Sequence, residues 1–230
     1  MISEYENVVE PTMDEVMNTG IALQGKWNKD FFKNENPITV ELACGGGEYT
    51  VGMAAMYPDR NFIGVDIKGN RIWKGATKAI EQGLNNVGFL RTRIDFIANC
   101  FAENEVDEIW ITFPDPQMNK NRRRKRLTNK LFLSRYNQFL KRGGKMRLKS
   151  DSDFFYEFTK EVINEKGLEV IFDCDDIYTK YTPQNPDSQL TKELSLKTFY
   201  ENMWLEEGKT IKYIEYTLDN LKIEEGEQLF

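Results

Sequence analysis

The sequence Phe-Pro-Asp-Pro at residues 113–116 stands directly before six basic side chains in the seven positions 120–126. Each proline fixes its own φ and pushes the preceding residue toward an extended backbone, so Asp115 is held stiffly between them. A rigid carboxylate beside a dense cationic loop indicates chemistry on a polyanion. The simpler alternative is a proline-rich turn followed by a solvated charge run.

A second candidate site lies at residues 41–48, Glu-Leu-Ala-Cys-Gly-Gly-Gly-Glu. This pattern predicts the end of a strand, a glycine turn and the start of a helix. Glycines let the backbone approach a ligand closely and adopt positive φ. A dinucleotide fingerprint would need a third glycine where this chain has Thr50, and the lysine of a phosphate-binding P-loop is also missing.

Two further acids follow predicted strands. Asp66 ends the strand 61–66, 19 residues beyond Gly47, where a carboxylate can accept hydrogen bonds from ribose hydroxyls. Asp95 follows the strand 87–90, where it can meet an adenine amino group. Groups for ribose and adenine without a pyrophosphate signature favour S-adenosylmethionine over NAD, although a plain strand–helix turn with two surface aspartates is the alternative.

The elements that must hold these residues alternate between strand and helix, which predicts a parallel sheet covered on both faces. The expected fold is a Rossmann-like class I methyltransferase fold in the α/β class, with a mostly parallel seven-stranded sheet and an antiparallel C-terminal strand. Ligands bind such sheets at the carboxyl ends of the strands. Strands are predicted at 38–42, 61–66, 87–90, 106–112, 145–148, 168–172 and 210–218, and helices at 48–57, 68–82, 128–140, 152–165 and 194–207.

Residues 1–36 are predicted to form an N-terminal extension, and residues 37–230 a single methyltransferase domain. The loop at about 176–192 has no clear period. Neither a membrane-length apolar run nor a signal peptide is visible, and three cysteines without paired spacing fit a reducing compartment, so a cytoplasmic protein is expected.

Composition narrows the chemistry further. The chain has no histidine, which excludes catalytic triads and acid–base catalysis that use this residue. The net charge is −6, but residues 1–37 hold three basic and seven acidic side chains, and residues 201–230 hold three and eight. The middle of the chain therefore carries +3, and its positive charge is concentrated beside Asp115, as phosphate binding needs.

Together these motifs resemble the tRNA (guanine-N7)-methyltransferase family over about residues 37–217. The residues that carry the resemblance are the glycine motif, the acids Asp66 and Asp95, the Phe-Pro-Asp-Pro sequence with its basic run, Lys149-Ser150-Asp151, and Thr198-Phe199-Tyr200-Glu201. The sequence departs from the family pattern at Ala43 for glycine, Gln117 for tryptophan, Asn119 for lysine and Arg122 for histidine. Lys120, one position further on, is the candidate for the lysine's role.

The resemblance implies methyl transfer from S-adenosylmethionine to N7 of a guanine in the tRNA variable loop, at tRNA position 46, without a metal and by a monomer or homodimer. It assigns catalysis to Asp115. The implied cofactor contacts are Glu41, Gly45, Gly47, Asp66, Asp95 and Asp115. The implied substrate contacts are Lys120, Arg122, Arg123, Arg124, Arg126, Asp151, Thr198 and Glu201.

Three other functions remain open from the sequence. The first is a class I methyltransferase that acts on another RNA or on protein, or on a small molecule. The second is an NAD-dependent oxidoreductase, which the missing third glycine disfavours. The third is a non-catalytic RNA-binding module on a methyltransferase fold, for which Ala43 is the one supporting feature.

Overall fold

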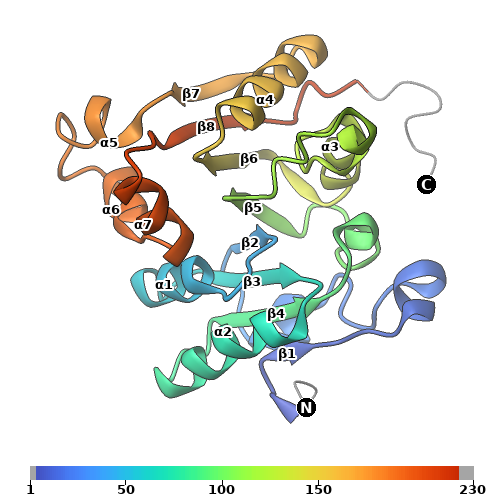
Figure 1. The fold of residues 1–230 in the computed structure, drawn as a ribbon. Coiled ribbons are helices and arrows are strands. Elements are labelled where there is room, and N and C mark those ends of the chain that lie inside the picture. The colour runs from blue at the N-terminus through green and yellow to red at the C-terminus, as the bar shows by residue number, and fades with distance from the viewer. Residues whose placement is uncertain (1–3, 223–230) are drawn as a thin grey trace. The chain divides into compact units, whose positions relative to one another are not determined.

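The computed structural model describes residues 4–222, which form two compact units. The first unit contains the described residues up to Trp110 together with Gln138–Lys141. The second contains Ile111–Asn137 and the described residues from Arg142 onward. Figure 1 shows the elements of both units along the chain.

The first unit is built on parallel strands. They follow the order β1 (Val8–Val9), β4 (Val87–Arg91), β3 (Asn61–Asp66) and β2 (Ile38–Leu42), and β5 (Val106–Thr112) comes next after β2. Every residue of β2 and β3 is buried, as expected for apolar strands covered on both faces. Strand β5 passes from the first unit into the second between Trp110 and Ile111.

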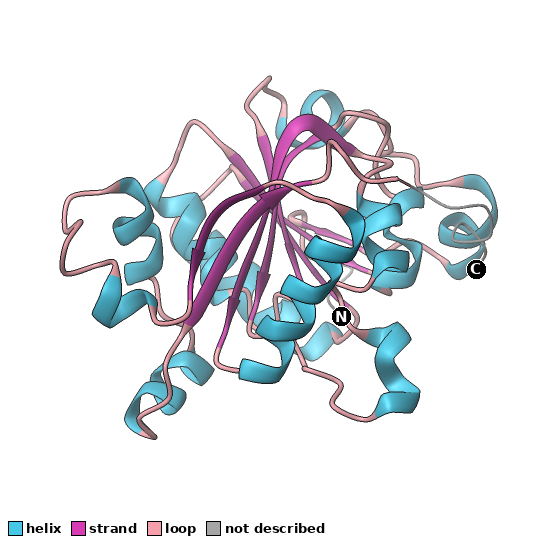
Figure 2. Ribbon diagram, turned by 90° about the horizontal axis from the view of Figure 1, so that it is seen from above, coloured by secondary structure: helices cyan, strands magenta, loops and turns pink. Residues whose placement is uncertain are grey.

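Helices connect these strands and cover them. The first unit contains α1 (Glu48–Met56), α2 (Gly69–Glu81), the π-helical segments η2 (Glu15–Thr19) and η3 (Trp27–Phe32), and the 3-10 segment η4 (Ile94–Asn99). Figure 2 shows helices on either side of the strands. Because each strand is followed by a helix, the strand-to-helix turns carry the candidate residues of this unit.

The second unit contains the antiparallel part of the sheet. After β5, the strands follow the order β6 (Leu140–Ser150), β8 (Lys212–Thr217) and β7 (Val170–Cys174), and β8 runs antiparallel to both neighbours. The helical elements are η5 (Lys120–Lys125), α3 (Lys130–Tyr136), α4 (Asp153–Lys166), α5 (Ile177–Lys180), α6 (Gln189–Ser195) and α7 (Phe199–Glu206).

The N-terminal segment packs into the first unit. The side chain of Trp27 is fully buried, stacks on Phe101 with ring centroids 5.5 Å apart, and donates a hydrogen bond of 2.9 Å to the Cys100 carbonyl. Strand β1 pairs with β4 in the same unit. The predicted boundary at residues 36 and 37 stays a prediction, and the chain first passes from one compact unit to the other elsewhere, between Trp110 and Ile111.

The predicted fold class is confirmed as an α/β sheet that is mostly parallel and has antiparallel C-terminal strands. Within residues 4–222 there are eight strands, because the two-residue strand β1 adds to the seven that the sequence predicts. None of the helices in this range has the length and apolar character that crossing a lipid bilayer requires.

Several predicted elements in the second half of the chain are wrong. The helix expected at 128–140 is the shorter α3, which Asn129 caps through a 3.0 Å hydrogen bond from the Leu131 N–H. Gly143 lies inside β6 and does not end a helix; its N–H bonds to the Asp219 carboxylate at 2.8 Å. The helix expected at 194–207 is divided into α6 and α7, and the loop expected at 176–192 contains α5 and the start of α6.

Candidate active site

In the first unit, the turn between β2 and α1 has three residues in the left-handed region of φ. They are Ala43 at +59°, Gly45 at +56° and Gly47 at +69°. A Cβ atom on Gly47 would lie 2.6 Å from Phe89 Cε1, so this position requires glycine. A Cβ on Gly45 would meet nothing within 4 Å, so the backbone there faces open space that a ligand can enter.

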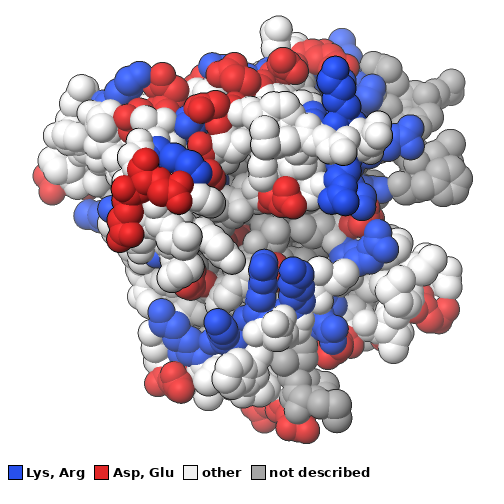
Figure 3. All heavy atoms as spheres, in the orientation of Figure 1, with Lys and Arg blue, Asp and Glu red and all other residues white. Residues whose placement is uncertain are grey.

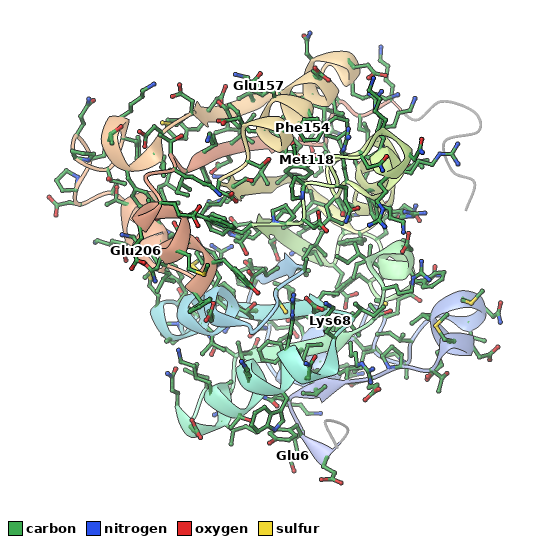
Figure 4. All side chains as sticks on the ribbon, viewed as in Figure 1. Glu6, Lys68, Met118, Phe154, Glu157 and Glu206 are labelled. Carbon is green, nitrogen blue, oxygen red and sulfur yellow. The ribbon has the colours of Figure 1, made fainter. Side chains whose placement is uncertain are left out.

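Asp66 organises the same turn from the end of β3. Its carboxylate accepts a 3.0 Å hydrogen bond from the Gly45 N–H and a 2.8 Å bond from the Lys68 N–H. Figure 4 labels Lys68 at the start of α2. Asp66 is buried, and one of its carboxylate oxygens, Oδ2, contacts the glycine turn. A carboxylate fixed by two backbone donors is pre-oriented to accept further hydrogen bonds.

Glu41 lies in β2, close to this turn. It is buried and accepts a 2.9 Å bond from the Thr50 N–H, and it is also hydrogen-bonded to the Thr50 hydroxyl. Burial raises the pKa of the Cys44 thiol well above its usual range, and the carboxylates of Glu41 and Asp66 raise it further. Two carboxylates, those of Glu41 and Asp66, thus lie close to the glycine turn, which suits a cationic or polyhydroxylated ligand.

The third predicted acid of this unit, Asp95, lies in the first turn of η4. Its carboxylate is partly exposed and forms an ion pair with Arg93 at 3.0 Å. A 3.2 Å bond from the Thr92 N–H to the Asp66 carbonyl ties the chain that precedes η4 to the end of β3. The structure thus gathers Glu41, Gly45 and Asp66 at one turn, with Asp95 on the segment that follows β4.

In the second unit, the Phe-Pro-Asp-Pro loop is held at both ends. Phe113 has a φ of +46°, and its N–H donates a 2.8 Å bond to the Lys149 carbonyl of β6. The Asp115 carboxylate is exposed and accepts a 2.9 Å bond from the Gln117 N–H, which forms an Asx turn. Gln117 itself has a φ of +47°. These constraints leave the Asp115 carboxylate fixed and open to solvent.

The buried side chain of Arg126 contacts this loop. Its Nε donates a 3.1 Å bond to the Gln117 carbonyl, and only 5% of the residue is exposed. Its guanidinium lies 4.5 Å from the ring centroid of Phe158 and 4.6 Å from that of Phe154, which Figure 4 labels on α4. Burial lowers the pKa of Arg126, as does the neighbouring Arg123. Its predicted contact with substrate stays a prediction, whereas its contact with the loop is direct.

The rest of the basic run is the 3-10 segment η5. Its basic residues, including Lys120, Arg122, Arg123 and Arg124, are exposed. Asn119, which stands where the family has lysine, caps η5 by accepting a 2.9 Å bond from the Asn121 N–H. Figure 3 shows Lys and Arg side chains gathered over η5 and α3. The basic side chains of η5 are thus exposed, whereas Arg126 directly after them is buried. The predicted substrate contacts of Lys120, Arg122, Arg123 and Arg124 stay predictions.

Glu201 lies in a buried environment that the sequence did not predict. The residue is completely buried, and its carboxylate oxygens lie 2.8 and 2.9 Å from the Lys149 ammonium, which is also completely buried. The Tyr178 hydroxyl bonds to the same carboxylate and lies 2.7 Å from the Leu194 carbonyl. Burial and the Glu201 charge raise the pKa of Tyr178, so the hydroxyl keeps its proton and donates. The predicted substrate contact of Glu201 stays a prediction.

Lys149 and Tyr178 are absent from the residues that the sequence predicts for the site. One signal for Lys149 is present, because basic residues occupy alternate positions 145, 147 and 149 of β6 and so share one face of the strand. Each meets an acid: Lys145 pairs with Glu215 at 2.8 Å, and Arg147 pairs with Glu193 at 2.5 Å. Arg147 and Lys149 are buried, and buried cations require partners, which the sequence alone does not identify.

The last two predicted substrate residues lie at element ends. Thr198 is the N-cap of α7, since its hydroxyl accepts a 3.2 Å bond from the Glu201 N–H. The Asp151 carboxylate lies 3.7 Å from the Lys209 ammonium, and its carbonyl accepts a 3.1 Å bond from Lys212. Asp151 does not cap α4, because Ser152 is the N-cap and accepts a 3.2 Å bond from the Phe155 N–H.

Comparison with known proteins shows which family the chain belongs to. A family model described as "Putative methyltransferase" matches residues 35–214. A tRNA (guanine-N(7)-)-methyltransferase of Christiangramia forsetii is 48% identical over 94% of this chain and 93% of its own length. One of Bacteroides fragilis is 49% identical over 94% of this chain and 82% of its own. The chain belongs to the tRNA (guanine-N7)-methyltransferase family.

Family membership confirms that this protein is an enzyme of the methyltransferase class. A solved S-adenosylmethionine-dependent methyltransferase from Aquifex aeolicus has the same fold, with a TM-score of 0.53 and 14% identity over 83% of this chain and 89% of that one. No group of three or more cysteine, aspartate or glutamate side chains suited to holding a metal ion occurs among residues 4–222.

Proposed function

We propose that the protein is a cytoplasmic tRNA methyltransferase that moves the methyl group of S-adenosylmethionine to N7 of a guanine in the tRNA variable loop. The products are 7-methylguanosine and S-adenosylhomocysteine. The names of the relatives support the reaction. The observation that carries it is the exposed Asp115 carboxylate, which an Asx turn fixes directly before an exposed cationic segment.

The residues of the glycine turn fit S-adenosylmethionine. The open space at Gly45 leaves room for a ligand against the backbone, and Asp66 presents a fixed carboxylate for ribose hydroxyls. Asp95 and Asp115 are the further candidates for cofactor contacts, and Glu41 acts through Thr50 and the turn. When bound, S-adenosylmethionine supplies a methyl group on a cationic sulfur, and the negative charge around the turn favours that cation.

Replacing Asp66 with alanine is expected to raise the dissociation constant for S-adenosylmethionine by about 10- to 100-fold. The change removes the proposed contacts with the ribose hydroxyls, and a hydrogen bond to a charged acceptor is worth about 1.5–3 kcal/mol. It also removes the acceptor that holds the Gly45 and Lys68 N–H groups in place. Isothermal titration calorimetry measures the constant. The matched control is Asp59→Ala, an exposed acid of the same unit, which should bind normally. Normal binding by folded Asp66→Ala protein would refute this role for Asp66.

The chemistry at guanine requires alignment more than proton transfer. N7 has an in-plane lone pair and no proton, so no base is needed to activate it, and a chain without histidine can catalyse the reaction. The new N7–CH₃ bond forms as the S–CH₃ bond breaks, and the electron pair stays on sulfur. The purine ring becomes cationic, and we assign the stabilisation of that developing charge to the Asp115 carboxylate.

The target guanine must also be presented. N7 in a folded RNA is shielded by stacking, so the nucleotide has to turn out of its stack before it reacts. The exposed cations of η5 are suited to hold the flanking phosphates, which would make binding strongly dependent on salt. We assign contacts with the base to Asp151 and Thr198, at the start of α4 and α7.

Transfer of labelled methyl from S-adenosylmethionine to purified acceptors tests this proposal. Label should enter unmodified tRNA and should be lost when the variable-loop guanine is changed to adenine. Label in the altered tRNA would move the reaction to another nucleotide. Label only in ribosomal RNA or protein would keep the methyltransferase fold but overturn the proposed substrate.

A further inference from the structure

The Glu201 side chain has no exposed surface for a substrate to contact. The residue is completely buried, as is Lys149, whose ammonium lies 2.8 and 2.9 Å from the two carboxylate oxygens. The Tyr178 hydroxyl donates a hydrogen bond to the same carboxylate. Donors from β6 and α5 therefore occupy both oxygens in the interior of the second unit. A role of Glu201 in the reaction must consequently act through other residues.

Glu201, Lys149 and Tyr178, which we call the Glu201 cluster, join the chain segments that precede α7 (Figure 1). The Lys149 ammonium lies 3.4 Å from the Leu194 carbonyl in α6 and 3.4 Å from the Leu196 carbonyl, which follows that helix. The Tyr178 hydroxyl lies 2.7 Å from the Leu194 carbonyl. The cluster thus holds the end of α6, the link to α7 and the third residue of α7 in one place.

The same cluster contacts both segments to which we assign contacts with guanine. The Glu201 N–H donates a 3.2 Å bond to the Thr198 hydroxyl, which fixes the start of α7. On β6, the Lys149 carbonyl accepts a 2.8 Å bond from the Phe113 N–H, and the Lys149 ammonium lies 5.8 Å from the Phe113 ring centroid. Phe113 begins the loop that carries Asp115. Lys149 therefore connects this loop to α7 through buried contacts.

We propose that Glu201 is a positioning residue for methyl transfer. Its cluster holds Thr198 and the Asp115 loop at a fixed separation, so guanine enters a site in which both groups are already aligned. This inference rests on the proposed function and gives Glu201 a role other than the substrate contact that the family resemblance implies. Misplacement of aligned groups slows a displacement reaction, so loss of the cluster lowers kcat more than it weakens binding.

Tyr178→Phe tests this role with the smallest change, because it removes one hydroxyl and leaves the ion pair between Lys149 and Glu201 in place. The matched control is Tyr156→Phe, which removes a hydroxyl that bonds to the Asp173 carboxylate in the same unit. Tyr178→Phe should lower kcat for unmodified tRNA about tenfold and change KM for tRNA less than about threefold. Tyr156→Phe should leave both constants at the wild-type values. An unchanged kcat for Tyr178→Phe, or an equal loss in both variants, would overturn the positioning role.

A double-mutant cycle with Glu201→Gln separates positioning from substrate contact. Glutamine keeps the shape of the side chain and removes its charge. Glu201→Gln should lower kcat, and adding Tyr178→Phe should lower it little further, because both changes disrupt one cluster. A raised KM for tRNA with normal kcat in Glu201→Gln would assign Glu201 to substrate contact and overturn the proposal. If Glu201→Gln does not fold, the kcat of Tyr178→Phe alone decides.

The wild-type protein distinguishes failure of this inference from failure of the proposed function. Wild-type methylation of tRNA together with a normal kcat for Tyr178→Phe would overturn the positioning role alone. Methylation of another acceptor only would overturn the proposed substrate, and the kcat of Tyr178→Phe on that acceptor would decide the positioning role. Absence of methyl transfer to any acceptor would overturn both.

Discussion

Replacing Asp115 with asparagine should reduce the rate of methyl transfer by about 10²–10³-fold, as the loss of one charge-stabilising group does in other enzymes. Asparagine keeps a side-chain oxygen that can accept the hydrogen bond from the Gln117 N–H, so the Asx turn survives and the negative charge alone is removed. Single-turnover kinetics with saturating tRNA and S-adenosylmethionine measures the chemical step.

Asp115→Ala separates the two contributions of this side chain. It removes both the charge and the turn, so its rate should lie at or below that of Asp115→Asn. The matched control is Asp187→Asn, an exposed aspartate of the same unit, which should react at the wild-type rate. An unchanged rate for Asp115→Asn, together with a slow Asp115→Ala, would assign Asp115 to loop structure and contradict its role in charge stabilisation.

The second large effect is expected on stability. Lys149→Met should lower the free energy of unfolding by about 3–5 kcal/mol, because it leaves the Glu201 carboxylate buried without its cation. Urea denaturation followed by circular dichroism measures the change. The control is Lys160→Met, which breaks a pair with Asp173 of similar length, 3.1 Å, but with both side chains partly exposed. That variant should lose less than about 1 kcal/mol.

The double variant Lys149→Met with Glu201→Leu tests the physical reason. Removing both charges also removes the unpaired buried carboxylate, so most of the lost stability should return. Lys149 also lies 5.8 Å from the Phe113 ring centroid, and its carbonyl holds the Phe113 N–H, so the pair connects α7 to the Asp115 loop. If Lys149→Met and Lys160→Met lost the same stability, the buried pair would not anchor α7.

The strands of the first unit were predictable because local pattern and burial agree there. Residues 38–42 and 61–66 are apolar runs bounded by turn residues, and both are fully buried strands. The elements of the second unit were harder to predict, because local sequence signals there disagree with the tertiary contacts. The Gly143-Gly144 pair is typical of a helix end, but the Asp219 carboxylate holds Gly143 within β6. Thr198 interrupts an otherwise helical pattern by capping α7.

Some residues of the candidate site were predictable from the sequence and others were not. The types and spacing of Asp66, Asp115 and the basic run were visible in the sequence because each lies at the end of a predictable strand. The partner of Glu201 was not visible, because Lys149 is 52 positions away and only tertiary packing joins them. Thr198 and Glu201 have the spacing of a capping box, yet only Thr198 caps, and the Glu201 carboxylate binds Lys149. Arg126 differs from its neighbours because two aromatic rings of α4 enclose it.

Chemical cleavage at 7-methylguanine shows whether the methyl group reaches N7 of a guanine in tRNA. Unmodified tRNA would be incubated with the enzyme and S-adenosylmethionine, then treated with borohydride and aniline, which break the strand at that base. We expect one new cleavage, in the variable loop, which Asp115→Asn strongly reduces. Methyl incorporation without any cleavage would place the methyl group on another atom and overturn the proposed reaction.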